Sequence, residues 1–291
     1  MTATTASSIT MIQFGQLPAV RIEAADGAQA TVALFGAHLL SWKTADGKER
    51  IFCSAKTALD GSKPIRGGIP VIFPQFNTRG DGLRHGFARQ STWRLIGDGV
   101  DTANSGNGNG GAYAEFGLAP GDVPAALALS WPHIFQLRLR FTLQANQLDI
   151  EFNVRNSGSA PFPFGVALHT YYDVGQLAAT TIDGLRGMRY TDPSLASVVQ
   201  DTPSLAFTEK LDRLYQAPPE LALHTADATL RLQQQGFSEW VVWNPGVEDA
   251  AALADLGDDE YLRFVCIEPA RVDQQMLDAG AEWTCRHSIR C

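Results

Sequence analysis

The 291-residue sequence has few cysteines and histidines, and those it has are widely separated. Its four cysteines are too few for the disulfide framework of a small secreted domain, and no two have the spacing of metal ligands. The closest two of its six histidines, His133 and His169, are 36 positions apart, which leaves no local metal motif of the His-x-His or His-Glu-x-x-His kind. The sequence therefore predicts reduced thiols and no local metal-binding motif.

The sequence also lacks an excess of basic residues, long apolar runs and a targeting segment. Lys and Arg total 23 against 31 Asp and Glu, so the net charge of -8 argues against binding nucleic acid or an anionic membrane. No apolar run approaches the roughly 18 residues of a membrane helix, and the N-terminus lacks the basic and apolar regions of a signal peptide. We expect a cytoplasmic protein that is a monomer or weak oligomer and takes a small-molecule ligand.

Long amphipathic helices are scarce, whereas alternation of apolar and polar residues is frequent. Residues 136–143 and 148–155 alternate strictly on either side of an Asn-Gln pair, which predicts a β-hairpin with one wet face. Repeated short strands without intervening helices indicate an all-β fold of packed antiparallel sheets, a β-sandwich, in one domain covering residues 1–291. The polar residues 1–10 are a candidate for disorder. Further strands are expected at 30–42, 229–232, 239–243 and 261–267, and one short helix at 249–256.

Spaced glycines in residues 97–111 superficially resemble a phosphate-binding loop. No strand-turn-helix frame surrounds them and no Lys-Ser/Thr pair follows, so a flexible hairpin loop is the better interpretation.

Positive charge is concentrated in one segment, residues 63–94. Six bases and a single acid, Asp81, give this segment a charge of +5, since 6 - 1 = 5, which leaves -13 elsewhere. Arginine matches phosphate or carboxylate oxygens with two hydrogen bonds, and nearby glycines let a ligand approach the backbone. A solvated or salt-bridged surface patch explains the same composition. We call these residues the basic segment: Lys63, Arg66, Arg79, Arg84, Arg89 and Arg94.

An isolated acid, Glu268, ends an apolar strand-like run. With a period of two, Glu268 shares a face with Phe264 and Cys266, and Pro269 keeps the backbone extended. Partial burial there raises the pKa of a carboxyl toward the range of a general base, whereas a nearby arginine lowers it. A structural Glu–Arg pair is the alternative.

A histidine, His169, projects beyond small side chains in a second apolar run. If this run is a strand, His169 shares a face with Gly165, Ala167 and Tyr171, which leaves room for a ligand. No Gly-x-Ser-x-Gly elbow or catalytic-cysteine signature supplies a nucleophile, so proton transfer is its expected chemistry, and a purely structural histidine is the alternative.

Six sequence blocks in register resemble the hexose-6-phosphate mutarotases, or glucose-6-phosphate 1-epimerases, of the aldose 1-epimerase superfamily. They are PIRGGIPVIFPQF, RHGFARQSTWRL, VALHTYYDV, KLDRLY, VVWNP and CIEPARV, and the similarity spans nearly the whole chain from Val32. The resemblance implies a large antiparallel β-sandwich of the galactose-mutarotase type, with a concave face for the sugar. It also implies a sugar-phosphate substrate and neither metal nor organic cofactor.

The same resemblance implies roles for individual residues. His169 and Glu268 match the family's acid and base. Arg84 stands where an uncharged residue often occurs in relatives, and Trp243 and Asn244 are as well explained by structural roles. The residues expected to bind substrate are Arg66, Arg84, His85, Arg89 and Asp212.

The expected reaction is interconversion of the α and β anomers of a hexose 6-phosphate, most simply glucose 6-phosphate. Glu268 would take the proton of the C1 hydroxyl while protonated His169 gives one to the ring oxygen, and the steps reverse after rotation about C1–C2. Two alternatives stay open: a 1-epimerase of unphosphorylated sugars and a carbohydrate-binding module without catalysis.

Overall fold

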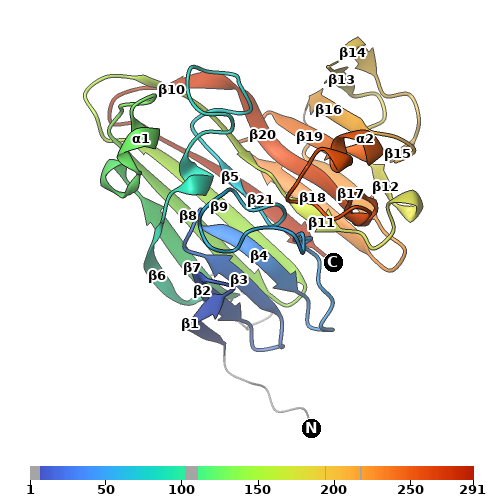
Figure 1. Cartoon of the computed structure of the whole chain (residues 1–291), viewed down its shortest axis with the longest axis horizontal. Helices are drawn as coiled ribbons and strands as arrows, with labels where there is room; N and C mark the ends of the chain where they lie inside the picture. The colour runs from blue at the N-terminus through green and yellow to red at the C-terminus, as the bar shows by residue number, and fades with distance from the viewer. Residues whose placement is uncertain (1–6, 102–110, 194, 217) are drawn as a thin grey trace.

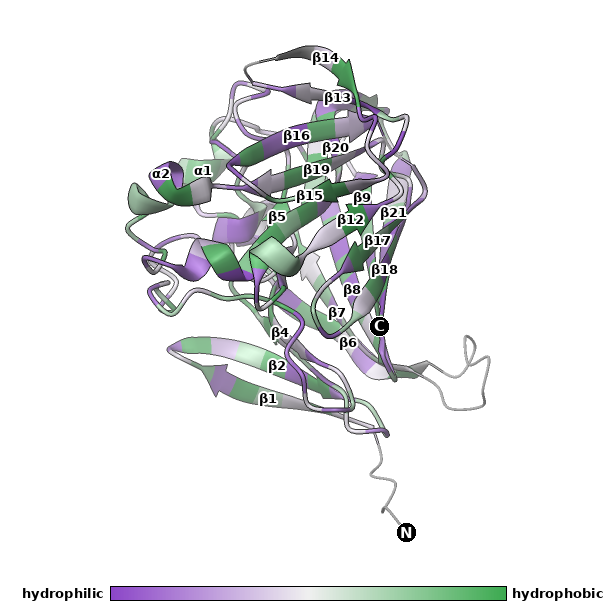
Figure 2. Cartoon of the chain, turned by 90° about the vertical axis from the view of Figure 1, so that its right-hand side faces the viewer, coloured by the Kyte–Doolittle hydropathy of each residue, from purple (hydrophilic) through white to green (hydrophobic). Residues whose placement is uncertain are grey.

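The computed structural model describes residues 7–101, 111–193, 195–216 and 218–291. Three antiparallel sheets account for its strands, and Figures 1 and 2 show them stacked with short helices at the periphery. None of the helices in these residues is long and apolar enough to span a membrane. The expected all-β sandwich of antiparallel sheets is thus confirmed.

The first sheet, which we call the N-terminal sheet, has four strands in sequence order. They are β1 (Ser8–Phe14), β2 (Leu17–Glu23), β3 (Gln29–Ala33) and β4 (His38–Lys43). A turn through Gly36 and Ala37, both with positive φ, divides the single strand expected at residues 30–42 into β3 and β4. The expectation of disorder to residue 10 is wrong for its last part, because β1 begins at Ser8, and residues 1–6 lie outside the described residues.

The second sheet, which we call the site sheet, is built mainly from the C-terminal half. Its order is β14 (Leu195–Val199), β13 (Arg189–Asp192), β16 (Leu211–Gln216), β19 (Glu239–Asn244), β20 (Phe264–Leu277), β10 (Phe162–Leu168) and β5 (Val71–Ile72), with β11 (Tyr171–Asp173) also paired to β20.

The third sheet, which we call the back sheet, has nine strands. Its order is β15 (Ser204–Ala206), β12 (Thr181–Asp183), β17 (Glu220–His224), β18 (Thr229–Gln235), β21 (Glu282–Arg290), β9 (Gln147–Asn156), β8 (Phe135–Gln144), β7 (Gly111–Leu118) and β6 (Arg94–Asp101). The β8–β9 pairing confirms the expected hairpin in register, from Phe135 opposite Asn156 to Gln144 opposite Gln147. The β6–β7 pairing makes the glycine-rich segment a hairpin, and the predicted loop itself, residues 102–110, lies outside the described residues.

The helical elements are short and lie between strands. They are α1 (Ala125–Ala128), α2 (Gly246–Ala251) and the 3-10 turns η1 (Ala88–Gln90), η2 (Pro120–Asp122), η3 (Leu177–Ala179) and η4 (Glu260–Arg263). The helix predicted at 249–256 therefore begins and ends earlier. The strand predicted from 261 is helical until Arg263, and β20 then continues beyond Pro269 to Leu277.

The main core fills the space between the site sheet and the back sheet. One continuous cluster of buried apolar residues includes Val166 and Ile267 of the site sheet, Phe152 of the back sheet, and Val32 of the N-terminal sheet. Because strand residues alternate between faces, Ala167 of β10 and Cys266 of β20 turn away from this core, into smaller clusters on the opposite face. That opposite face carries the candidate site.

Candidate active site

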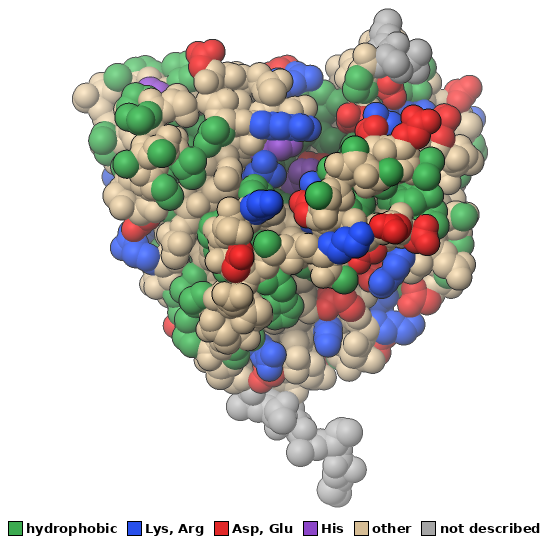
Figure 3. Space-filling model, in the orientation of Figure 1, with side chains coloured by type: hydrophobic (Ala, Val, Ile, Leu, Met, Phe, Trp, Pro, Cys, Tyr) green, Lys and Arg blue, Asp and Glu red, His purple; other side chains and the backbone are tan. Residues whose placement is uncertain are grey.

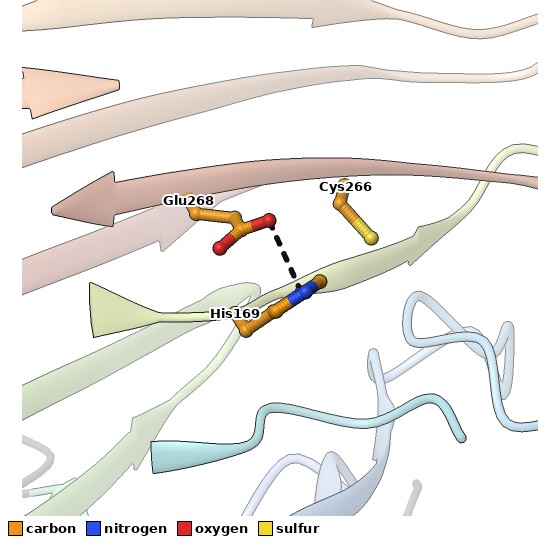
Figure 4. A group of neighbouring side chains, drawn as sticks. All are labelled: His169, Cys266 and Glu268. Carbon is orange, nitrogen blue, oxygen red and sulfur yellow. Dashed lines mark ion pairs between the residues drawn. The ribbon is translucent and has the colours of Figure 1, made fainter. Parts of the chain in front are cut away.

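His169 and Glu268 meet on the face of the site sheet that turns away from the core. His169 follows directly after β10 and Glu268 lies within the neighbouring β20, and the Nδ1 atom of His169 is 3.2 Å from Oε1 of Glu268. Figure 4 shows the two side chains directed toward one another, with Cys266 beside them. Glu268 is 1% exposed, and its Oε2 atom has no hydrogen-bond partner among the described residues. A carboxylate and an imidazole about 100 positions apart in sequence thus form one buried pair.

Burial disfavours the charged form of both members of this pair. It raises the pKa of Glu268 well above its usual value, an effect that the charge of Asp212 strengthens and that of Arg89 opposes. Burial also lowers the pKa of His169 well below its usual value, and neighbouring His85, Arg89 and Arg66 act in the same direction. Perturbed pKa values of this kind mark catalytic acids and bases.

Arg66 is held beside this pair by two side chains. Its Nη1 atom donates to the hydroxyl of Tyr171 at 3.0 Å, and its Nε atom donates to Asp255 at 3.2 Å. The ring of Tyr171 stacks on that of His169, with centroids 4.9 Å apart and planes 8° from parallel. Tyr171 therefore connects the arginine to the imidazole.

The two glycines after Arg66 allow its backbone to reach this position. A Cβ on Gly67 would lie 2.5 Å from the Cys53 backbone, and one on Gly68 would lie 2.3 Å from Nε2 of His38; both glycines have positive φ. That buried His38 nitrogen donates to the Gly67 carbonyl at 2.8 Å. The close approach of chain segments therefore requires glycine at both positions.

The side chain of Gln75 holds the loop that carries Arg84 and His85 by hydrogen bonds to its backbone. This buried amide accepts a hydrogen bond from the Gly82 backbone at 2.7 Å and donates to the carbonyls of Gly82 and Asn77. The Asn77 backbone N–H donates to Nδ1 of His85 at 3.3 Å, so Nε2 carries the proton of the neutral ring. The loop therefore presents a neutral imidazole with one defined donor, and the ring centroids of His85 and His169 are 5.8 Å apart.

Three of the expected arginines gather around this imidazole. Burial, followed by the charges of Arg89, Arg84 and Arg66, lowers the pKa of His85 to about 3. Burial and the two neighbouring arginines lower the pKa of Arg89 to about 10, which still leaves it charged at neutral pH. Arg89 donates to the Arg84 carbonyl at 3.2 Å, and neither side chain has a carboxylate partner among the described residues. Figure 3 shows Lys and Arg side chains around a hollow in which histidine is visible.

The rest of the basic segment fits the surface-patch interpretation. Arg79 pairs with Asp273 at 2.5 Å and Arg94 pairs with Asp122 at 3.1 Å, both largely at the surface. Lys63 is exposed.

Asp212 borders the site from two strands away. On β16 it lies opposite Trp243 of β19, which in turn lies opposite Cys266 of β20. Burial and the charge of Asp192 raise the pKa of Asp212. The structure thus places Asp212 on the same face as the pair, without direct contact.

Three further residues of the site have no counterpart among the sequence predictions of function. Tyr171 and Cys266 share their faces with His169 and Glu268 by simple alternation, so period two was the signal for both. Asp255 lies between α2 and η4, and its distance of 189 positions from Arg66 leaves no local signal. Asn244 has a structural role, because its side chain bonds to the carbonyls of Tyr261 and Phe264.

Comparison with known proteins identifies the family of this chain. The model of the family described as Aldose 1-epimerase matches residues 18–290. The chain belongs to the aldose 1-epimerase family. A relative from Cenchrus ciliaris named "Putative glucose-6-phosphate 1-epimerase" is 33% identical over 273 residues, 89% of this chain and 80% of the relative. An Escherichia coli relative of the same name is 33% identical over 251 residues, which are 83% of this chain and 79% of the relative.

Solved structures show the same fold in other epimerase-family chains. One from Salmonella typhimurium, described as a "putative mutarotase", superposes with a TM-score of 0.85 at 28% identity over 97% of this chain and 92% of that one. A galactose 1-epimerase from Lactobacillus acidophilus superposes with a TM-score of 0.72 at 13% identity over 98% of each chain, which concerns the fold alone. The resemblance stated from the sequence blocks is therefore confirmed.

Proposed function

We propose that the chain interconverts the α and β anomers of a hexose 6-phosphate, with D-glucose 6-phosphate as its main substrate. The observation that carries the proposal is the buried Glu268–His169 pair, 3.2 Å apart, next to arginines that lack carboxylate partners. The relatives' printed names and the family support the same reaction.

The chemistry needs one proton taken and one given. Glu268 takes the proton of the C1 hydroxyl while His169 donates to the ring oxygen, which opens the hemiacetal to the aldehyde. After rotation about C1–C2 the hydroxyl attacks the other face of the aldehyde, and the two protons return. The pair therefore ends with the protons it began with, and general acid–base catalysis of this kind contributes on the order of 10²- to 10⁴-fold.

The phosphate would lie across the ring from C1, against Arg66 and Arg89, with Arg84 at the rim. A doubly charged phosphate has the oxygens to match guanidinium forks, which favours phosphorylated over free hexose. The charges of Arg89 and Arg66 are among the causes that lower the pKa of His169. Burial is the largest cause of that shift, so neutralising the two arginines with phosphate would raise the pKa of His169 only in part.

His85 and Asp212 complete the proposed sugar contacts. The neutral ring of His85 offers one N–H donor at Nε2, and the half-buried carboxylate of Asp212 offers acceptors for sugar hydroxyls. No metal or organic cofactor has a role in these steps. A cytoplasmic location and a monomer or weak oligomer remain our predictions.

The test is the rate of anomerisation of glucose 6-phosphate and of glucose, followed by NMR exchange at C1. We expect kcat/KM to be at least about tenfold higher for the phosphosugar, as for an added charge-assisted contact. Equal values would favour the 1-epimerase of free sugars. Glu268→Gln keeps the shape of the side chain and should abolish turnover with the fold retained; normal anomerisation by this variant would refute the assignment. A native chain that binds the sugar without accelerating exchange would be a carbohydrate-binding module.

A further inference from the structure

The thiol of Cys266 has no part in the proposed proton transfers, yet it lies beside the proposed acid and base, His169 and Glu268. One donor atom each of His169, Cys266 and Glu268 lies within 4.8 Å of the other two. Figure 4 shows the three side chains converging from β20 and the end of β10. Cys266 is fully buried.

These three groups are the donors that zinc-like cations prefer. Imidazole nitrogen, thiolate sulfur and carboxylate oxygen bind Zn²⁺ at about 2.0 to 2.3 Å, so donors around a tetrahedral ion lie roughly 3.3 to 3.6 Å apart. The His169–Glu268 contact of 3.2 Å already has nearly this spacing, and the sulfur needs to approach by at most about 1.5 Å. Rotation about a single side-chain bond can supply such a movement.

Unsatisfied polar atoms point to a ligand at the same place. Nδ1 of His169 and Oε2 of Glu268 are both buried and have no hydrogen-bond partner among the described residues. Buried polar atoms are normally paired, so these two atoms are available to an ion, which would have to displace only the contact of the Cys266 thiol with Tyr171 and the ion pair itself. The nearby charges of Arg66 and Arg89 oppose a cation, whereas a thiolate and a carboxylate together offset them.

We propose that a thiophilic divalent cation, such as Zn²⁺, binds to His169, Cys266 and Glu268 and inhibits the enzyme by occupying its acid and base. The ion acts as an inhibitor and not as a cofactor. Its binding releases the thiol proton to solvent and leaves a fourth coordination position open to water or a sugar hydroxyl. The inhibition rests on the proposed function, whereas the binding itself does not.

The direct test is titration of the full chain with Co²⁺, a spectroscopic substitute for Zn²⁺. We expect a thiolate-to-cobalt charge-transfer band in the near ultraviolet that Zn²⁺ abolishes by competition. Cys266→Ser and Cys266→Ala should both lack this band, while the matched control Cys291→Ser, which changes a thiol just after β21 of the back sheet, should keep it. A band that persists without Cys266, or no band in the native chain, overturns the proposal.

The kinetic test separates the two proposals. Zn²⁺ at ten times its dissociation constant should lower kcat/KM for glucose 6-phosphate about tenfold in the native chain, with recovery on addition of EDTA. Whatever activity each Cys266 variant has without metal, the same Zn²⁺ concentration should lower it by less than about twofold. A Cys266-dependent cobalt band in a chain without anomerase activity would support the metal site and refute the proposed function. Activity that Zn²⁺ inhibits equally with and without Cys266 would refute the metal site alone.

Discussion

Tyr171 contacts both Arg66, which is proposed to bind phosphate, and His169, which is proposed to transfer a proton. Removing its hydroxyl therefore tests the two roles separately. Its oxygen accepts a hydrogen bond from Arg66 at 3.0 Å, while its ring stacks on His169 with centroids 4.9 Å apart. Tyr171→Phe removes the first contact and retains the second. We therefore expect this substitution to weaken substrate binding without slowing the proton transfers.

The expected change in KM depends on the contacts that Arg66 retains in Tyr171→Phe. A hydrogen bond to a charged group contributes about 1.5 to 3 kcal/mol, but Arg66 retains Asp255 at 3.2 Å and is partly open to water. The lower end of that range applies, which corresponds to about a tenfold increase in KM for glucose 6-phosphate. The value of kcat should change by less than about twofold, because the stacked ring still orients the imidazole.

Steady-state anomerisation of glucose 6-phosphate measures both constants. Asp255→Asn serves as a parallel variant, since it weakens the other contact of Arg66 and should raise KM without altering kcat. Tyr171→Leu removes the stacked ring as well and should lower kcat. An unchanged KM in Tyr171→Phe and Asp255→Asn would refute the role of Arg66 in holding phosphate, and a fall in kcat with constant KM would show that the hydroxyl serves the chemistry.

Three further predictions concern charge, pH and backbone shape. Arg84→Ala should raise KM for glucose 6-phosphate about fivefold, the effect of about 1 kcal/mol from a partly screened cation, while Arg79→Ala, which only breaks a surface ion pair, should leave kinetics unchanged. Burial lowers the pKa of His287 to about 4, below the 6.5 of the unfolded chain, so this residue's contribution is complete above pH 6.5 and is lost as the pH falls toward 4. His287 should therefore account for about 2 kcal/mol of the stability lost at pH 5 in urea unfolding, and His287→Gln should remove that share while the buried His38 and His85 keep theirs. Gly68→Ala puts a Cβ 2.3 Å from a buried histidine nitrogen at a positive φ and should cost about 3 kcal/mol or more, whereas Gly47→Ala, in open space at a similar φ, should cost about 1 kcal/mol in the same assay.

The sequence predicts the strands best where two faces have different surroundings. The hairpin of β8 and β9 has one face in the core and one in water, so its alternation is clean and its register follows. Prediction was wrong at residues 261–263, where the sequence does not alternate between apolar and polar residues. Tyr261 belongs to a 3-10 turn although it precedes a strand, and its ring packs against the smaller cluster around Phe264. Tertiary packing, absent from a local pattern, decides such boundaries.

The positions of His169 and Glu268 on their strands could be predicted one at a time, but their contact could not. Alternation predicts that His169 and Glu268 each share a face with their strand neighbours. Whether those faces coincide depends on the pairing of β10 and β20, whose register shifts at a bulge between Phe164 and Val166. A bulge changes which side chains lie side by side, and the isolated Gly165 is a signal of a bulge that does not by itself fix the resulting register. The resemblance to a known family supplied the pairing that spacing alone does not.

The basic segment shows why charge counted along a sequence overstates the charge available to a ligand. Arg79, Arg94 and Arg66 find carboxylates 194, 28 and 189 positions away, so their charges are already opposed. Arg84 and Arg89 form no ion pair with a carboxylate among the described residues, although the more distant charges of Asp212 and Glu268 act on them. A phosphate monoester carries about -1.5 to -2 at neutral pH. A phosphate would thus supply the ion-pair partner that Arg84 and Arg89 lack, whereas an uncharged sugar would leave both guanidinium groups without one.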